Sequence, residues 1–255
     1  MQKYTYTVDF YESVNQRASE TAKLVFEILN KYVRVNSIVD AGCGSGAWIR
    51  TALEEGLEKA YGLDLTSSID LINKNSDFKE QLDSGRIELI ERDFVSNPIS
   101  EFPKADLAVC LEVLEHLPPS TAESLVARLT EASDFVIFSA AQPGQGGTYH
   151  INEQELRYWV DQFAKYDFEP FDPFREILSE SNFVPRFYSL NMLLLVSKEA
   201  LSAGDKIIDR TSLLDVKVTD FQQLDKKSFL EKVRYKLIAI LPVSTVTWLS
   251  KKFKY

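Results

Sequence analysis

Two acidic residues and three glycines form the first group whose residue types and spacing could do chemistry. Between Ser37 and Leu65, Asp40 ends one short apolar run and Asp64 ends a second one. Glycines occupy the alternate positions 42, 44 and 46 between them, where the missing Cβ lets the backbone turn sharply and approach a ligand. A carboxylate at the end of the second run can accept hydrogen bonds from both hydroxyls of a ribose. The pattern therefore predicts a site for a ribose-containing cofactor.

The glycine spacing separates one kind of cofactor loop from another. A dinucleotide-binding fingerprint requires G-x-G-x-x-G after the strand, whereas this chain has Gly42-Cys43-Gly44-Ser45-Gly46 and contains no phosphate-binding G-x-x-x-x-G-K-S/T. The motif D-x-G-x-G-x-G with a later acid resembles the donor-binding loop of class I S-adenosylmethionine-dependent methyltransferases. The resemblance covers about residues 11–198 and implies S-adenosylmethionine as the cofactor. A glycine turn inside some other α/β domain is the alternative interpretation.

The resemblance also implies which residues contact the donor. In that family, an acid at the end of the third strand commonly meets the adenine amino group, which corresponds to Asp93, with Phe94 available to pack on the base. The alternative for Asp93 is a helix or turn cap. The implied donor-binding residues are Asp40, Gly42, Cys43, Gly44, Gly46, Asp64, Leu65, Asp93, Phe94, Leu111 and Glu112.

The two histidines of the chain each follow an apolar run. His116 lies in L-E-V-L-E-H-L-P, which resembles the segment after the fourth strand of many small-molecule methyltransferases, and His150 lies in a glycine-rich loop after the next run. Ligands of open parallel sheets bind outside the carboxyl ends of the strands, so both are candidate catalytic residues. A hydroxyl acceptor benefits from a positioned base. His150 is the first candidate for this base, and His116, oriented by Glu112 or Glu115, is the second. In the alternative interpretation, Glu115 is an acid at the start of a helix and His116 is a hydrogen-bonded polar residue without a catalytic role.

A longer pattern points to the acceptor. The sequence G-Q-G-G-x-x-H-I-N, then Y-W, F-D-x-F-R and a closing Y-x-x-N-M-L-L-L, resembles a bacterial branch of small-molecule methyltransferases often linked to glycan or natural-product modification. Members of that branch often have Gln-Asn before the last strand, where this chain has Leu190-Asn191. The implied substrate-binding residues are Gln145, Tyr149, Asn152, Arg175, Tyr188 and Asn191.

Alternating strands and helices must position these residues. Apolar periodicity predicts a helix over 11–33 and further helices between successive strands. The predicted strands cover 37–39, 60–63, 86–90, 105–111, 134–139, 166–172 and 187–196. The predicted fold class is α/β, a Rossmann-like seven-stranded, mostly parallel sheet with helices on both faces; the resemblance implies that the last strand is antiparallel. We divide the chain into a methyltransferase domain, 1–198, and a C-terminal extension, 199–255, with a basic amphipathic helix.

Composition limits the remaining possibilities. With 255 residues, 45% of them hydrophobic, the chain can bury one sizeable core. Its two cysteines, Cys43 and Cys110, offer neither a disulfide framework nor zinc spacing, so no metal is expected. The first 16 residues lack the apolar region of a signal peptide, and no run of 18 apolar residues occurs. A cytoplasmic protein is predicted, with peripheral contact at the inner membrane as the alternative.

The charge is unevenly distributed. Residues 226–255 hold eight basic residues and one acid, a formal charge of +7. Because the whole chain has a net charge of −9, the first 225 residues have a net charge of −16. An acidic body argues against nucleic acid as a partner. The basic amphipathic segment within 227–255 could lie on an anionic membrane, dock onto the acidic body, or contact a second copy in a homodimer.

These observations predict a methyltransferase that transfers the methyl group of S-adenosylmethionine to a hydroxyl of a sugar or another polar small molecule, as in polysaccharide modification. An amine or carboxylate acceptor is an alternative, and a carboxylate would need no base. A non-catalytic methyltransferase-like scaffold is a second alternative. A nicotinamide-dependent oxidoreductase is disfavoured by the glycine spacing.

Overall fold

The computed structural model describes residues 8–95 and 100–221, with side chains placed from residue 16 onward. Residues 1–7, 96–99 and 222–255 lie outside the description. The predicted membrane or homodimer contact through 227–255 falls on these residues and stays a prediction. In the described ranges, no helix combines the length and the apolar character that crossing a membrane requires.

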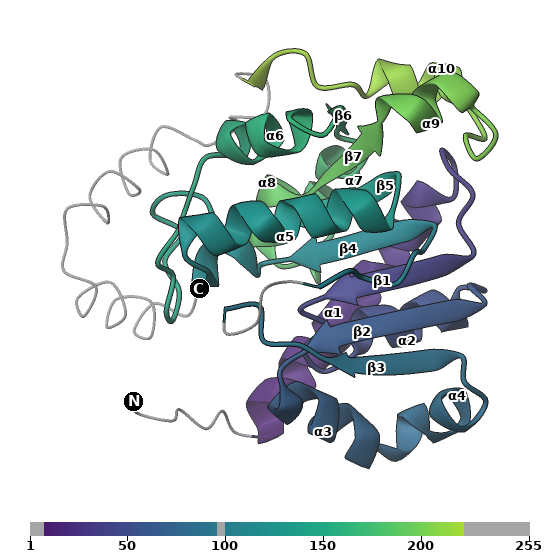
Figure 1. Cartoon of the computed structure of the whole chain (residues 1–255), viewed down its shortest axis with the longest axis vertical. Helices are drawn as coiled ribbons and strands as arrows, with labels where there is room; N and C mark the ends of the chain where they lie inside the picture. Colours follow the sequence, from purple (N-terminus) through teal and green to yellow (C-terminus); the bar gives the residue numbers. More distant parts are fainter. Residues whose placement is uncertain (1–7, 96–99, 222–255) are drawn as a thin grey trace.

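The described residues form a seven-stranded sheet in the order β3-β2-β1-β4-β5-β7-β6 (Figure 1). The strands are β1 (Ser37–Ala41), β2 (Lys59–Asp64), β3 (Ile87–Glu91), β4 (Leu107–Leu111), β5 (Phe135–Ser139), β6 (Phe168–Phe171) and β7 (Leu193–Ser197). The first five strands pair in parallel, whereas β7 is antiparallel to both β5 and β6. The predicted fold class, including the antiparallel last strand, is confirmed. Because β1 lies between β2 and β4, the strand order reverses there, which is where ligands bind in such sheets.

Helices cover both faces of the sheet (Figure 1). They are α1 (Val8–Leu29), α2 (Ala47–Glu54), α3 (Thr66–Lys74), α4 (Lys79–Asp83), α5 (Pro119–Ala132), α6 (Leu156–Ala164) and α7 (Arg175–Glu180), with short 3-10 helices η1 (Ser76–Phe78) and η2 (Leu114–His116). Successive strand residues point to opposite faces. On β5, Phe135 and Ile137 join the apolar cluster beneath α1 and α2, and Val136 and Phe138 join the cluster beneath α5 and α6. The central strands are therefore buried on both sides.

One predicted strand is partly helical. Residues 187–196 were predicted to be extended throughout, but Arg186–Asn191 forms helix α8 and only Leu193–Ser197 forms β7. Pro185, with φ of −57°, stands immediately before the helix, where its missing N–H costs nothing. The helix matters for the site because it turns Tyr188 and Asn191 toward the loops that follow β4 and β5.

The chain after β7 packs onto the sheet domain. Residues 199–221, which we call the strap, contain most of α9 (Lys198–Ala203) and all of α10 (Arg210–Asp215). The strap forms isolated bridges from Ile207 to Val33 and from Lys217 to Phe171. Leu213 of the strap is completely buried in the cluster beneath α1. The first part of the predicted extension is thus built into the same core.

Asp106 joins the strap to the starts of two strands. Its Oδ2 accepts hydrogen bonds from the backbone N–H groups of Asn36 and Ser37 at 2.9 and 3.1 Å, and its Oδ1 accepts one from Lys206 Nζ at 2.7 Å. Burial alone would raise the pKa of Asp106, but the hydrogen bonds from Lys206 and Asn36 outweigh it and hold the pKa below its usual value. The carboxylate therefore supports the end of the sheet opposite the donor loop.

Candidate active site

The glycine loop after β1 adopts the conformation that the sequence predicts for a close backbone approach. Gly42, Gly44 and Gly46 have φ of 87°, 54° and 80°, in the left-handed region that favours glycine. A Cβ at Gly42 would lie 2.4 Å from Cγ2 of Val113, so the loop touches the segment that follows β4. Helix α2 begins directly after Gly46, and its first N–H groups are available at the loop.

The two predicted acids bracket this loop. Asp64 Oδ2 accepts a hydrogen bond from the Gly44 N–H at 2.7 Å, and Oδ1 accepts one from the Leu65 N–H at 2.6 Å. Each carboxylate oxygen keeps a further lone pair for a ribose hydroxyl. Asp40 is 3% exposed, and burial, followed by the negative charge of Asp64, raises its pKa to about 8. Two acids thus lie beside the donor loop, and burial favours the protonated form of Asp40.

The residues predicted to meet the adenine, Asp93 and Phe94, follow β3, and Leu65, predicted to bind the donor, follows the neighbouring strand β2. Asp93 Oδ1 accepts a hydrogen bond from the Val95 N–H at 2.9 Å, the turn-cap arrangement considered as the alternative. Phe94 is 8% exposed, and its ring centroid lies 6.1 Å from that of Phe102. Leu65 is 49% exposed and is the more accessible apolar side chain of this group. Adenine contact by these residues stays a prediction.

A polar network connects the donor loop to the acceptor side. Glu112 follows β4 with φ of 55°, a left-handed conformation that costs a non-glycine residue about 1–3 kcal/mol. Its Oε2 accepts from Gln145 Nε2 at 2.8 Å and its Oε1 from Asn191 Nδ2 at 3.3 Å. Asn191 also donates to Gln145 Oε1 at 2.8 Å and accepts from Gln142 at 3.0 Å. The structure therefore brings together predicted donor-binding and substrate-binding residues, next to the half-buried Leu111.

The other predicted substrate residues differ in accessibility. Asn152 is 3% exposed and donates to the Leu114 carbonyl at 3.3 Å, while Arg175 is 6% exposed and donates to Asp172 and to the Leu190 carbonyl at 2.5 and 2.6 Å. These two side chains hold backbone segments in place. The remaining pair lie nearer the acceptor side.

Tyr188 and Tyr149 are that remaining pair. Tyr188 lies edge-on to Trp48, with ring centroids 6.0 Å apart, and burial followed by the charge of Glu112 raises its pKa. Tyr149 is 61% exposed, with φ of 66°. An exposed ring on a strained loop is available to a substrate, whereas the Tyr188 hydroxyl is held neutral inside the site.

The two histidines meet as their placement predicts. Strands β4 and β5 are paired in parallel, and the rings of His116 and His150 lie beyond their ends with centroids 4.8 Å apart and planes at 83°. His150 Nδ1 lies 2.8 Å from Glu153 Oε1, and His116 Nδ1 lies 3.3 Å from the Tyr149 carbonyl oxygen. The prediction that Glu112 or Glu115 orients His116 is wrong, because the Tyr149 carbonyl takes that position.

Glu153 is a further candidate site residue, which the sequence analysis did not single out. Besides His150, its carboxylate accepts the backbone N–H groups of Gly144 at 2.7 Å and Gly146 at 2.9 Å. Burial alone would raise its pKa, but these hydrogen bonds and His150 outweigh it and lower the pKa. The H-x-x-E spacing was the available signal, but it specifies proximity only on a helix, and residues 150–153 form a loop.

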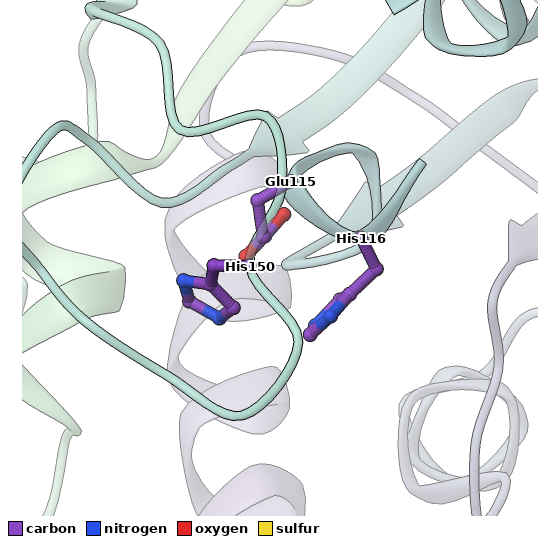
Figure 2. A group of neighbouring side chains, drawn as sticks. All are labelled: Glu115, His116 and His150. Atoms are coloured by element: carbon purple, nitrogen blue, oxygen red, sulfur yellow. The ribbon is translucent and has the colours of Figure 1, made fainter. Parts of the chain in front are cut away.

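Glu115 lies beside both histidines (Figure 2). It is completely buried, and burial followed by the charge of Glu112 raises its pKa to about 9, against the effect of the Glu115 and Ala141 backbone N–H groups. Burial and then the charge of His150 lower the pKa of His116. One ligand-capable atom each of Glu115, His116 and His150 lies within 4.8 Å of the others, although the sequence predicted no metal site.

The fold, the acid-bracketed glycine loop and the reversal of strand order beside it define the class: this is a class I S-adenosylmethionine-dependent methyltransferase. More specifically, the chain belongs to the family described as "Methyltransferase domain", which matches residues 14–186. The predicted family, its cofactor and its enzyme class are thereby confirmed.

Relatives and solved structures agree with this assignment. The chain is 30% identical over 79 residues to ribosomal protein L11 methyltransferase of Lachnospira eligens and 28% identical over 103 residues to ubiquinone biosynthesis O-methyltransferase of Alkalilimnicola ehrlichii. The first match spans 31% of this chain and 25% of the relative, and the second spans 40% of each. Magnesium protoporphyrin IX methyltransferase from Synechocystis, solved with bound S-adenosylhomocysteine, has the same fold: TM-score 0.53, 17% identity, 77% of this chain and 90% of that one.

Proposed function

We propose that this chain transfers the methyl group of S-adenosylmethionine to a hydroxyl oxygen of a sugar or another polar small molecule. One observation carries the proposal: two histidines and a carboxylate meet at the ends of β4 and β5, next to the strand whose glycine loop would hold the donor. The reaction forms a C–O bond as the S–C bond breaks, and the sulfonium leaves as a neutral thioether. The hydroxyl proton must go to a base.

In the metal-free protein, His150 is the base that the geometry favours. Glu153 is an acceptor at Nδ1, so Nδ1 carries the proton of the neutral ring and Nε2 keeps its lone pair. A positioned base contributes ~10²–10⁴-fold to such a reaction. His116, held at Nδ1 by a weaker contact to a carbonyl oxygen, is the second candidate.

The acceptor side favours a polar substrate. Glu112, Gln142, Gln145 and Asn191 present amide and carboxylate groups there, and such groups recognise hydroxyls through paired hydrogen bonds. The matching relative from ubiquinone biosynthesis is by name an O-methyltransferase, which supports oxygen as the methylated atom. A role in glycan or natural-product modification rests on the loop and closing motifs of the sequence. A cytoplasmic location is part of the proposal, in keeping with the free thiols of Cys43 and Cys110.

Calorimetry with S-adenosylhomocysteine and a methylation screen test this proposal. Wild-type protein should bind the product, and Asp64→Ala should weaken that binding before it affects turnover. Labelled S-adenosylmethionine offered with nucleotide sugars and glycans should label a hydroxyl, and His150→Ala should lower turnover far more than donor affinity. Absence of product binding would favour the scaffold alternative, and label on nitrogen or a carboxylate would reassign the acceptor.

A further inference from the structure

Glu115 has a buried carboxylate that the fold does not satisfy. Its side chain is completely buried, and within residues 8–95 and 100–221 neither carboxylate oxygen makes a hydrogen bond of good geometry; the nearby Glu115 and Ala141 backbone N–H groups only partly offset the cost of burial. Glu112, one helical turn earlier, has both oxygens paired with side-chain amides. A buried carboxylate without a partner is costly, so it either stays protonated or binds a cation.

The backbone around Glu115 brings the histidine loop to it. The Glu115 carbonyl accepts the N–H groups of Ile151 at 2.8 Å and Asn152 at 3.0 Å, directly after His150. Figure 2 shows the Glu115 carboxylate pointing from its short helix toward the two imidazole rings. The three side chains therefore converge from the ends of two adjacent strands.

Both imidazole rings are held at Nδ1 by an oxygen atom. Nδ1 of His150 faces the Glu153 carboxylate, and Nδ1 of His116 faces the Tyr149 carbonyl. Histidines that bind metals almost always donate one ring N–H to a carboxylate or a carbonyl, which fixes the ring and leaves the other nitrogen as the ligand. Here that nitrogen is Nε2 in both rings.

Space at Nε2 of His150 depends on a residue without a side chain. A Cβ at Gly147 would lie 2.1 Å from Nε2, and Gly147 does not have the left-handed φ that would by itself require glycine. Any side chain at position 147 would therefore displace the ring. The glycine therefore allows the imidazole to keep its observed position.

We propose that Glu115, His116 and His150 bind a divalent transition-metal ion. One carboxylate and two imidazoles form a ligand set that suits zinc or iron, and three protein ligands leave positions open for other groups. Metal bonds of about 2.0–2.2 Å place neighbouring ligand atoms roughly 3–4 Å apart. The ligand atoms of the three residues lie up to 4.8 Å apart, and a small rotation of the exposed His116 side chain would bring them into this range.

An ion here would change how the hydroxyl loses its proton, because His150 Nε2 would be a metal ligand and no longer a base. The proton of the bound hydroxyl would then pass to solvent water. A hydroxyl bound at an open position loses its proton more readily because the cation stabilises the alkoxide. This use of the ion rests on the proposed methyl transfer, whereas ion binding itself does not.

Titration of the metal alone tests the site. Tag-free protein, treated with a chelator and dialysed, is titrated with Zn²⁺ and, separately, Mn²⁺ by calorimetry, with Mn²⁺ also followed by electron paramagnetic resonance. We expect binding of one ion per chain. Glu115→Gln, His150→Ala and Gly147→Ala should each weaken it at least ~10-fold. Glu155→Gln, an exposed acid outside the site, should leave the affinity unchanged.

Two results would overturn the site: no binding of one ion per chain, or binding that survives Glu115→Gln in a variant that folds normally by circular dichroism. The first would mean that Glu115 is simply a protonated buried acid, and the second that the ion is held elsewhere on the surface. Titration of S-adenosylhomocysteine into the same samples separates the two proposals. In the wild-type protein, product binding without metal binding refutes the metal site alone, whereas metal binding without product binding refutes the proposed methyl transfer alone.

Discussion

Replacing Glu153 by Gln tests whether one carboxylate organises the acceptor side. Oε1 of Glu153 faces both His150 Nδ1 and the Gly146 N–H, and Oε2 accepts the Gly144 N–H. A glutamine keeps only one oxygen, so its NH₂ group must face a backbone N–H or the histidine proton. A hydrogen bond to a charged group contributes about 1.5–3 kcal/mol. If that contribution is lost from the transition state, turnover falls roughly 10- to 150-fold.

The assay compares turnover and product affinity in the same variant. Labelled methyl transfer to an acceptor found in the screen gives kcat, and calorimetry with S-adenosylhomocysteine gives the donor-site affinity. That affinity should be unchanged, because Glu153 hydrogen-bonds within the loop after β5 and not to the donor loop after β1. Glu155→Gln removes an exposed acid two residues away and is the matched control. Turnover of Glu153→Gln within about twofold of wild type would refute the reasoning, and an equal fall in product affinity would show that the loop belongs to the donor site.

Three further predictions concern the frame of the site. Gly42→Ala should lower the free energy of unfolding, measured in urea, by more than Gly56→Ala does. Both glycines have a positive φ, which costs an alanine about 1–2 kcal/mol, but only a Cβ at position 42 would meet another side chain. Equal losses would mean that Val113 moves aside at no cost. Asp106→Asn should cost about 1–3 kcal/mol at pH 7. Because the folded pKa of Asp106 is lowered, its stabilisation is fully present above the unfolded pKa of about 3.9 and is lost progressively as the pH falls from there through the folded pKa; a difference from wild type that does not shrink as the pH falls below about 3.9 would contradict this. Arg175→Met leaves the nearly buried Asp172 without its cation and should cost about 3–5 kcal/mol, with product affinity retained in the folded fraction; unchanged stability would return Arg175 to the substrate-binding role.

The sheet could be predicted because its signals are local. The apolar runs of β1, β2 and β4 end at an acid, Asp40, Asp64 or Glu112, and a strand buried on both faces must be apolar throughout. The same reasoning failed at 187–191, where an apolar run is compatible with a short helix as well as a strand. Only the packing of α8 against its neighbours decides between them.

The site could be predicted where it depends on strand ends. Asp40, Asp64 and the two histidines lie where the ends of β1, β2, β4 and β5 place them. Glu153 and the unpaired state of Glu115 could not be predicted, because both depend on how the loop after β5 folds back across η2. The contacts of Glu153 lie within an irregular loop, and the hydrogen bonds of the Glu115 carbonyl reach the distant residues Ile151 and Asn152, so neither set leaves a periodic signal in the sequence.

The course of the strap determines where the rest of the chain is attached. Val218 donates its N–H to the Pro170 carbonyl at 3.0 Å, and the Phe221 ring lies 6.0 Å from the guanidinium of Arg157, in the first turn of α6. That turn follows the loop of His150 and Glu153 almost immediately. The last described residue of the strap therefore lies beside α6, the helix that directly follows the loop of His150 and Glu153, and not beside the glycine loop after β1.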